Sequence, residues 1–339
     1  MRRYIIRRLL ISIPILIGVS LVTFTFANLA PGDPISALVG PGSDIRSQDL
    51  EKLKHELGLD RPAPERYLAW LGLQPIVALF TGQQAVPGIL EGNLGVSYQG
   101  QSVAKTLGQA IPNTLKLMLT ALIISVTLGV LLGVFSAFRQ GSRIDNLMTA
   151  VVFSGISLPS YLIALIAVFV FAVEIKDVTG FALFPAGGLQ DPSSKLPPIV
   201  DQIWHMLLPA LVLAFAGTAT FLRYTRASVL EVMRHDYVTT ARSKGLAEQT
   251  VRRRHVLRNA LLPIVTVIGL SLPSLVTGAL FVELLFSWPG VGRMAIEATK
   301  LHDYPVIMAV ALLTSVVIVL ANLATDIAYA FIDPRIRVS

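Results

Sequence analysis

Residues 117–138 read LMLTALIISVTLGVLLGVFSAF, a run of 22 residues that contains no Asp, Glu, Lys or Arg. As an α-helix with a rise of about 1.5 Å per residue, this run would be about 33 Å long, which matches the roughly 30 Å hydrocarbon core of a bilayer. A single charge at its centre would cost about 2.5–3.5 kcal/mol on insertion scales. The run therefore predicts a membrane-spanning helix.

Five further runs of 17 or more residues lack charged side chains in the same way: 9–30, 147–173, 206–222, 260–282 and 304–325. Charged residues make up only 14% of the chain, against about 25% in ordinary soluble domains. The alternative, a large soluble protein with six buried helices, would have too little polar surface to cover itself. We therefore expect an all-α integral membrane protein with six transmembrane helices.

The first run follows basic residues and could be mistaken for a cleavable signal peptide. It is longer than the usual apolar core of about 7–15 residues, and the sequence Ala-Asn-Leu-Ala-Pro at 27–31 is not a small-x-small cleavage site. We interpret the first run as a retained span. The chain then divides into the N-terminus with the first span (1–30), an outer loop (31–105) with a short helix expected at 49–58, and a core with spans two to six (106–339).

Basic residues gather in alternate connections between the six runs. The segments 1–8, 139–146, 223–259 and 326–339 hold 17 of the 28 Lys and Arg in 67 residues, whereas the remaining connections hold 11 in 139 residues. Loops enriched in Lys and Arg are the cytoplasmic ones. This distribution predicts that both termini are cytoplasmic. It also explains the net charge of +7 without nucleic acid as a partner.

The inner segment 223–259 contains a predicted short helix at 236–245, read as DYVTTARSKG. Asp236 is a candidate N-cap, and Gly245 suits the left-handed residue just past a helix end. Arg242 and Lys244 fall in the last turn, where cations favour the negative end of the helix dipole. The spacing thus predicts a capped rod of about eight residues, about 12 Å long.

On this rod Tyr237, Val238 and Ala241 are expected to share one face, followed at once by Leu246. A second basic helix over 249–259 would lead back to the membrane. Such a rod could enter a groove on a partner protein. Equally, it could rest on lipid headgroups, with the arginines at 252–254 binding phosphates, and the residues alone do not separate these two interpretations.

Part of this segment resembles the cytoplasmic-loop signature of ABC-importer permeases, the membrane components of binding-protein-dependent transport. Ala241 and Gly245 match that pattern, whereas Thr239 and Thr240 stand where Glu-Ala is usual. In the peptide-importer branch the pattern is similar to Tyr-Val-x-x-Ala-x-x-Lys-Gly followed by Arg-Asn-Ala-Leu-Leu-Pro. Residues 237–245 and 258–263 match both halves.

Further blocks resemble the B-type subunit of dipeptide and oligopeptide permeases. They are RRLL at 7–10, APGDP at 30–34, GNLG at 92–95, SY at 97–98, IPNT at 111–114, ELLFSWPGVG at 283–292 and DPR at 333–335. The blocks occur in order along nearly the whole chain. The chain departs from the pattern at about 72–90, which looks like an insertion, and at Ala247, where the family usually has a capping serine.

The resemblance implies a type I ABC-importer permease fold in the cytoplasmic membrane of a prokaryote. It also implies four partners, with membrane lipid around the complex: a homologous C-type permease subunit, two cytosolic ATP-binding subunits and an extracytoplasmic solute-binding protein. The residues that would couple to the ATPases are Tyr237, Val238, Ala241, Arg242, Lys244, Gly245 and Leu246. Relatives in this branch carry dipeptides, oligopeptides, nickel chelates, glutathione or oligosaccharides, so the peptide substrate is one of several alternatives.

The outer segment after the fifth run offers Glu283, Trp288, Pro289 and Gly290 as candidates. They could touch the binding protein or form part of an outer gate. Alternatively, Trp288 could be an anchor at the headgroup level, where tryptophan is enriched.

Other functional classes find little support in the sequence. The chain has no Gly-x-x-x-x-Gly-Lys-Ser/Thr loop for ATP phosphates, so ATP hydrolysis is assigned to partner chains and no catalytic residue is predicted. It has no cysteine and no pair of histidines at i, i+4, so neither a metal site nor a cofactor is predicted. None of the six runs contains His, Glu or Asp, which argues against an intramembrane enzyme and against a self-sufficient carrier.

Prolines and glycines inside the runs point to packing or hinging. Pro159 and Pro273 lie in mid-run, Gly129 and Gly133 are four residues apart, and Gly155 is a further small position. Glycines at this spacing let helices approach closely, and proline bends a helix. The same residues could also form the hinges of a gated pathway.

Overall fold

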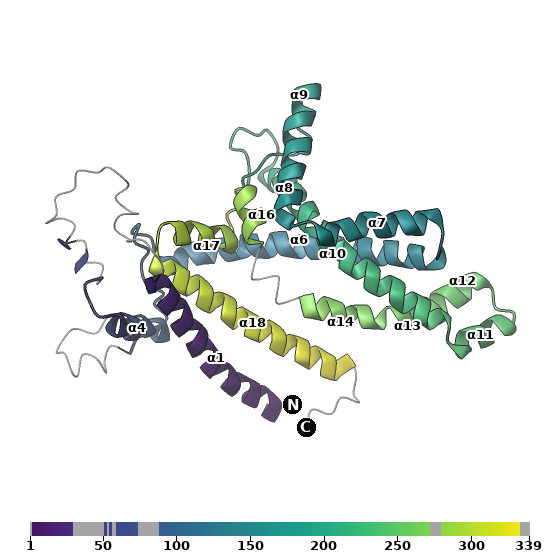
Figure 1. Ribbon diagram of the computed structural model, residues 1–339, viewed down its shortest axis with the longest axis horizontal. Helices are drawn as coiled ribbons and strands as arrows, with labels where there is room; N and C mark the ends of the chain where they lie inside the picture. The colour runs from purple at the N-terminus through teal and green to yellow at the C-terminus, as the bar shows by residue number, and fades with distance from the viewer. Residues whose placement is uncertain are drawn as a thin grey trace. The chain divides into compact units, whose positions relative to one another are not determined.

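The computed structural model describes residues 2–29, 51–52, 54–55, 59–73, 88–271 and 279–332 (Figure 1). Within these ranges the regular structure is helical, apart from one antiparallel bridge between Val96 and Ser102. The predicted all-α class is therefore confirmed for the described part of the chain. The predicted short helix near 49–58, the insertion near 72–90 and Pro273 lie largely or wholly outside the described residues.

The helices are bounded as follows: α1 Arg2–Leu29, α4 Ala63–Leu71, η1 Ile89–Glu91, α6 Val103–Phe138, α7 Arg143–Ser157, α8 Ser160–Val168, η2 Phe169–Glu174, α9 Ile175–Thr179, α10 Pro198–Met233, α11 Asp236–Ser243, α12 Glu248–Thr250, η3 Val251–Leu257, α13 Arg258–Ala260, α14 Leu262–Ser271, α16 Leu280–Leu285, α17 Val291–Lys300 and α18 Tyr304–Ile332. The segments η2 and η3 are π-helical, and η1 is a single 3₁₀ turn.

Four helices are long and apolar enough to cross a membrane: α1, α6, α10 and α18. They contain the first, second, fourth and sixth of the predicted runs. The helices extend well past these runs, since α6 and α10 have 36 residues each. As a result α10 carries a buried Asp201 and a buried His205 one turn apart, just outside its apolar run.

The third and fifth runs are not single long helices in the described residues. The third is divided at Pro159, where α7 ends at Ser157 and α8 begins at Ser160. Proline has no N–H and clashes with the preceding turn, so the division at this residue has a direct cause. Figure 1 shows α8 and α9 stacked in one column that turns away from α7. The fifth run comprises α14 and α16, with residues 272–278 between them outside the described part.

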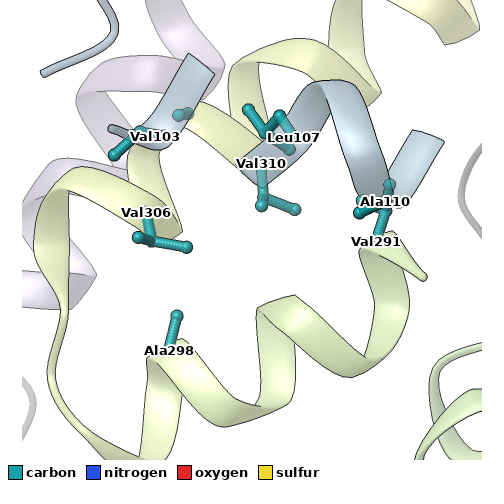
Figure 2. Packing of buried hydrophobic residues seen from close by; sticks show 8 residues of the cluster. Val103, Leu107, Ala110, Val291, Ala298, Val306 and Val310 are labelled. Carbon is teal, nitrogen blue, oxygen red and sulfur yellow. The ribbon is translucent and has the colours of Figure 1, made fainter. Parts of the chain in front are cut away.

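The chain forms two compact units, and the first consists of residues 1–113 and 290–323. Its core joins the start of α6 (Val103, Leu107 and Ala110) to α17 and to the start of α18. Figure 2 shows side chains of all three helices converging on this core. The helix α17 places one face in the core and leaves the Arg293–Glu297 ion pair, 2.6 Å long, on the other.

Still in the first unit, the short helix α4 packs on α1. The hydroxyl of Tyr67 lies 2.8 Å from the hydroxyl of Ser20, and the ring of Tyr67 contacts that of Phe24 at 5.2 Å. The guanidinium of Arg66 lies over the ring of Tyr304 at 5.7 Å. These contacts fix α4, a short helix of the outer segment 31–105, against the first span.

The second unit, residues 114–289 with the end of α18, is built on close packing of α6 against α10. A methyl group added at Gly133 would lie 2.7 Å from Cβ of Thr225 and 2.9 Å from the carbonyl oxygen of Leu222. A methyl group at Gly129 would overlap Phe221 in the same way. The predicted packing role of these two glycines is confirmed, because only glycine lets the two backbones come so close.

Candidate functional site

The predicted rod is present as α11, which has eight residues. His235 is its N-cap, with an extended backbone (φ −71°, ψ 144°) and no capping side chain. The prediction that Asp236 is the N-cap is therefore wrong by one position, because the backbone turns helical one residue earlier than expected. As the first helical residue, Asp236 still places its charge at the positive end of the helix dipole.

The C-terminal end of α11 agrees with the sequence. Arg242 lies in the last turn, and Lys244 is the C-cap. Gly245 follows with φ +74°, in the left-handed region that costs other residues about 1–2 kcal/mol. The left-handed Gly245 is confirmed, and it ends α11 sharply.

One face of α11 is buried in this chain itself. Val238 is fully buried, and Ala241 is 5% exposed. They pack with residues of α6, α10, η3 and α13, namely Ala137, Val229, Val232, Val251, Val256 and Ala260. The expectation that Tyr237, Val238 and Ala241 share a face open to a partner is wrong. An isolated helix of eight residues is unstable in water, so it needs these contacts to form.

The other predicted coupling residues are exposed, on α11 itself and directly after its end. Tyr237 is 42% exposed and Leu246 is 43% exposed; Arg242, Lys244 and Gly245 are exposed as well. The ring of Tyr237 stacks on that of His235 at 5.5 Å, and its hydroxyl accepts a hydrogen bond from Nδ2 of Asn259 at 3.1 Å. This exposed surface is what α11 offers to another molecule.

An exposed ion-pair group holds the turn after α11. The carboxylate of Glu248 accepts hydrogen bonds from Nη2 of Arg242 at 3.1 Å and from Nε of Arg252 at 3.3 Å. Arg242 is the main cause of the lowered pKa of Glu248. Arg252 also lies 4.8 Å from the ring of Phe138 at the end of α6. Exposed pairs of this kind contribute about 1 kcal/mol or less, so the group orients the turn more than it stabilises the fold.

The second basic helix expected at 249–259 is present as α12, η3 and α13. Its N-cap is Ala247, which makes no capping hydrogen bond, as expected where the family has serine. At the far end, Oγ of Ser228 donates to the carbonyl oxygen of Ala260 at 2.8 Å and ties this return segment to α10. Figure 1 shows α11 and α12 together beyond the end of α10.

A buried polar group near the start of α7 was missed by the sequence reasoning. Asp145 is 2% exposed and accepts hydrogen bonds from Nε and Nη2 of Arg226, each at 3.0 Å. It also accepts from Oγ of Ser136 and, at 2.9 Å, from the backbone N–H of Gly141. The Arg226 guanidinium holds the pKa of Asp145 well below its usual range. Arg226 is 81 residues away in sequence, so no local pattern could have revealed the pair.

The outer candidates Glu283 and Trp288 are fully buried within the second unit. Oε1 of Glu283 accepts a hydrogen bond from Oγ1 of Thr114 at 2.9 Å. The indole of Trp288 packs on Leu117 and Ala210. Contact with a binding protein through these two side chains is therefore contradicted, as is a headgroup anchor at Trp288. Their burial follows from the closeness of α6, α10 and α16, which the sequence did not predict.

Pro289 is half-buried, and Gly290 is buried at the N-cap of α17. A role of this segment in an outer gate stays a prediction. Within the described residues, no group of three or more His, Cys, Asp and Glu side chains is placed to hold a metal ion.

Comparison with known proteins identifies the chain. Residues 129–338 match the family described as "Binding-protein-dependent transport system inner membrane component", and residues 1–118 match the N-terminal part of such membrane components. The first match alone covers more than half of the 339 residues. The chain belongs to this family. It is thus a multi-pass inner-membrane permease of a bacterial ABC importer, and it is a transport component without catalytic activity of its own.

Two relatives match this permease over almost its whole length. The oligopeptide transport system permease protein AppB of Bacillus subtilis is 39% identical, over 99% of this chain and 100% of that protein. The dipeptide transport system permease protein DppB of Escherichia coli K12 is 35% identical, over 99% of both chains. The predicted family and the likeness to peptide permeases are confirmed.

A solved structure shows the same fold. A chain of the MetNI methionine ABC transporter, in an inward-facing conformation, aligns with a TM-score of 0.53, over 68% of this permease and 97% of that chain. The identity is 16%, so this likeness concerns the fold alone.

Proposed function

We propose that this permease forms half of the translocation pathway of an ATP-driven importer for dipeptides and oligopeptides. One observation carries the substrate class: the two relatives of 35–39% identity, aligned from end to end, are a dipeptide and an oligopeptide permease. Nickel chelates, glutathione and oligosaccharides are the alternatives that use the same machinery.

The partners follow from the membership in a binding-protein-dependent system. A homologous C-type permease would complete the pathway, two ATP-binding subunits would drive it, and a solute-binding protein would deliver the peptide. We further propose a type I fold with six spans, in which the third is interrupted at Pro159. The Lys and Arg bias supports an orientation with both termini in the cytoplasm.

The helix α11 is proposed as the contact with an ATP-binding subunit. Its outer face, with Tyr237 and Leu246, is exposed, whereas Val238 and Ala241 fix its inner face to α6 and α10. A displacement of α11 by ATP-driven closure would therefore be passed directly to the ends of two long helices. The pathway would then shift between outward- and inward-facing populations, with the energy supplied by nucleotide.

The substrate proposal is tested in proteoliposomes that contain this permease with its partner permease, ATP-binding subunits and binding protein. We expect uptake of labelled dipeptide or oligopeptide that requires both ATP and the binding protein. Glutathione, a nickel chelate and an oligosaccharide serve as competitors. Uptake without the ATP-binding subunits would contradict the importer, and preferential uptake of one of the competitors would contradict the peptide substrate.

The coupling role is tested separately with single cysteines, because the natural chain has none. A cysteine at exposed Leu246 should form a disulfide with a cysteine placed on an ATP-binding subunit, whereas one at buried Val238 should not. Leu246→Asp should uncouple ATP hydrolysis from uptake, whereas Leu196→Asp, at an equally exposed leucine outside the 223–259 segment, should not. Ala241→Glu is unsuitable, because it would bury a charge in the chain's own core. Normal uptake by Leu246→Asp would contradict the coupling role and would favour a helix that rests on lipid.

A further inference from the structure

A small cavity lies between α7 and α10 within the second unit. Its volume is about 160 Å³. Thr149 and Val152 of α7 and Ala219, Leu222, Arg223 and Arg226 of α10 line it. Its lining therefore combines apolar residues with two arginines, which follow one end of the apolar stretch of α10.

Its position coincides with the border between apolar and polar sequence. The third charge-free run begins at 147 on α7, and the fourth ends at 222 on α10. Val152, Ala219 and Leu222 lie within these runs, whereas Arg223 and Arg226 lie just beyond them. Helices that cross a bilayer place such a border near the lipid headgroups.

Arg226 lines the cavity, and its guanidinium is held in a fixed orientation by Asp145. A guanidinium has five N–H donors, and Arg226 uses Nε and one donor of Nη2 on Asp145 and Ser136. Its other three donors have no acceptor among the described residues. Because Asp145 is buried and itself held by Ser136 and Gly141, Arg226 is held ready to bind an oxyanion.

Arg223 adds a second cation at the same end. It is exposed, and its only recorded interaction in the described part of the chain is with the ring of Tyr224 at 5.5 Å. With Arg226 and Asp145 counted together, the site keeps one net positive charge. The hydroxyl-bearing Thr149 faces the same cavity from α7.

The apolar surface continues beside the cavity along α7. Leu147 is 65% exposed and Val151 is 49% exposed, so the described residues of the second unit leave this face of the helix uncovered. An amphiphile with a negative head matches this arrangement at both ends, whereas a peptide carboxylate would match only the arginines. Basic pockets between spans on the cytoplasmic side are known sites for anionic headgroups.

We propose that the cavity between α7 and α10 binds an anionic phospholipid, with the phosphate at Arg223, Arg226 and Thr149 and an acyl chain along Val152 and Leu222. The inference rests on the membrane location of the chain and not on the transported substrate. It gives Asp145 a second role, because the carboxylate positions Arg226 for a lipid phosphate.

The test uses the full-length permease, purified in detergent and mixed with equal amounts of phosphatidylglycerol and phosphatidylcholine with the same acyl chains. Native mass spectrometry should show preferential retention of phosphatidylglycerol. Arg223→Gln should weaken this retention about fivefold, since one basic residue near an anionic headgroup contributes about 1 kcal/mol. Thr149→Phe, which fills the cavity without a change of charge, should weaken it as well.

The matched control is Arg234→Gln, which removes an exposed arginine at the C-cap of α10 that does not line the cavity. Its retention of phosphatidylglycerol should equal that of the natural chain. The proposal is overturned by equal retention of both lipids, by an equal loss in the control, or by displacement of phosphatidylglycerol by free dialanine. None of these outcomes bears on ATP-driven peptide uptake, so failure here is distinguishable from failure of the proposed function.

Discussion

Substitution of Gly133 by alanine should loosen the contact between α6 and α10. The new methyl group would lie 2.7 Å from Cβ of Thr225 and 2.9 Å from the carbonyl oxygen of Leu222. The first atom belongs to a fully buried side chain and the second to a helix backbone, so neither can move aside alone. The two helices would have to separate over several turns.

The magnitude follows from two opposing effects. Overpacking of a well-packed interface costs about 1–3 kcal/mol, and this contact lies at the upper end because backbone atoms oppose the methyl group. Replacement of glycine by alanine inside a helix stabilises the helix by about 1 kcal/mol, because alanine has the higher helix propensity. We therefore expect a net destabilisation of about 1–2 kcal/mol for Gly133→Ala.

Gly108→Ala in the same helix is the matched control, because no atom lies within 4 Å of its new methyl group. It should stabilise the chain by up to about 1 kcal/mol, so the two variants should differ by about 2–3 kcal/mol. Equilibrium unfolding in mixed micelles with a rising fraction of dodecyl sulfate measures both. Equal stabilities for the two variants would refute close helix packing at Gly133.

Three further predictions concern polar groups. Asp145→Asn should destabilise the chain by about 1–3 kcal/mol, because it removes the charge that compensates the partly exposed Arg226. Unfolding in mixed micelles measures this loss. A second change in the same chain, Arg226→Gln, should restore part of the lost stability. Thr114→Val should lower the free energy of unfolding by about 1–3 kcal/mol in the same assay, since it removes a hydrogen-bond donor from the buried Glu283. An unchanged stability would mean that this hydrogen bond is not formed. The lowered pKa of Glu248 means that its contribution is complete above the ordinary value of 4.5 and is lost only as the pH falls through the lower folded value. The difference in stability between the natural chain and Glu248→Gln should thus stay constant from about pH 8 to about pH 6 and shrink at acid pH; a loss near neutral pH would contradict this ion pair.

The sequence predicted the helices well where a single physical requirement dominates. The four unbroken spans follow from uninterrupted apolar runs, because lipid admits no charge there. Pro159 and Gly245 each act through their own backbone, so their effects were predictable from position alone. The N-terminal extension of α10 was not predictable from the apolar run, because its buried Asp201 and His205 are held by specific contacts, among them the backbone N–H of Asp191 on Asp201.

The candidate site was predicted in place but not in orientation. Periodicity alone located α11, yet it could not say which face of the helix would be buried, since Val238 and Ala241 pack on residues up to about a hundred positions away. Asp145 with Arg226, and Glu283 with Thr114, are likewise pairs of distant residues. Such contacts depend on how the helices pack together, which no local pattern encodes.

The division of the third span at Pro159 has a consequence for biogenesis. At about 1.5 Å per residue, the 15 residues of α7 are about 22 Å long and do not reach across a 30 Å bilayer core, whereas α8 continues through η2 and α9 as one helical column from Ser160 to Thr179. Between them, Pro159 supplies no N–H, and acyl chains cannot satisfy the carbonyl oxygen left over. The helix α7 gains a stable place in lipid only when α10, against which it packs, has been synthesised to cover it. It should leave the translocon late, paired with a helix that follows it in the chain.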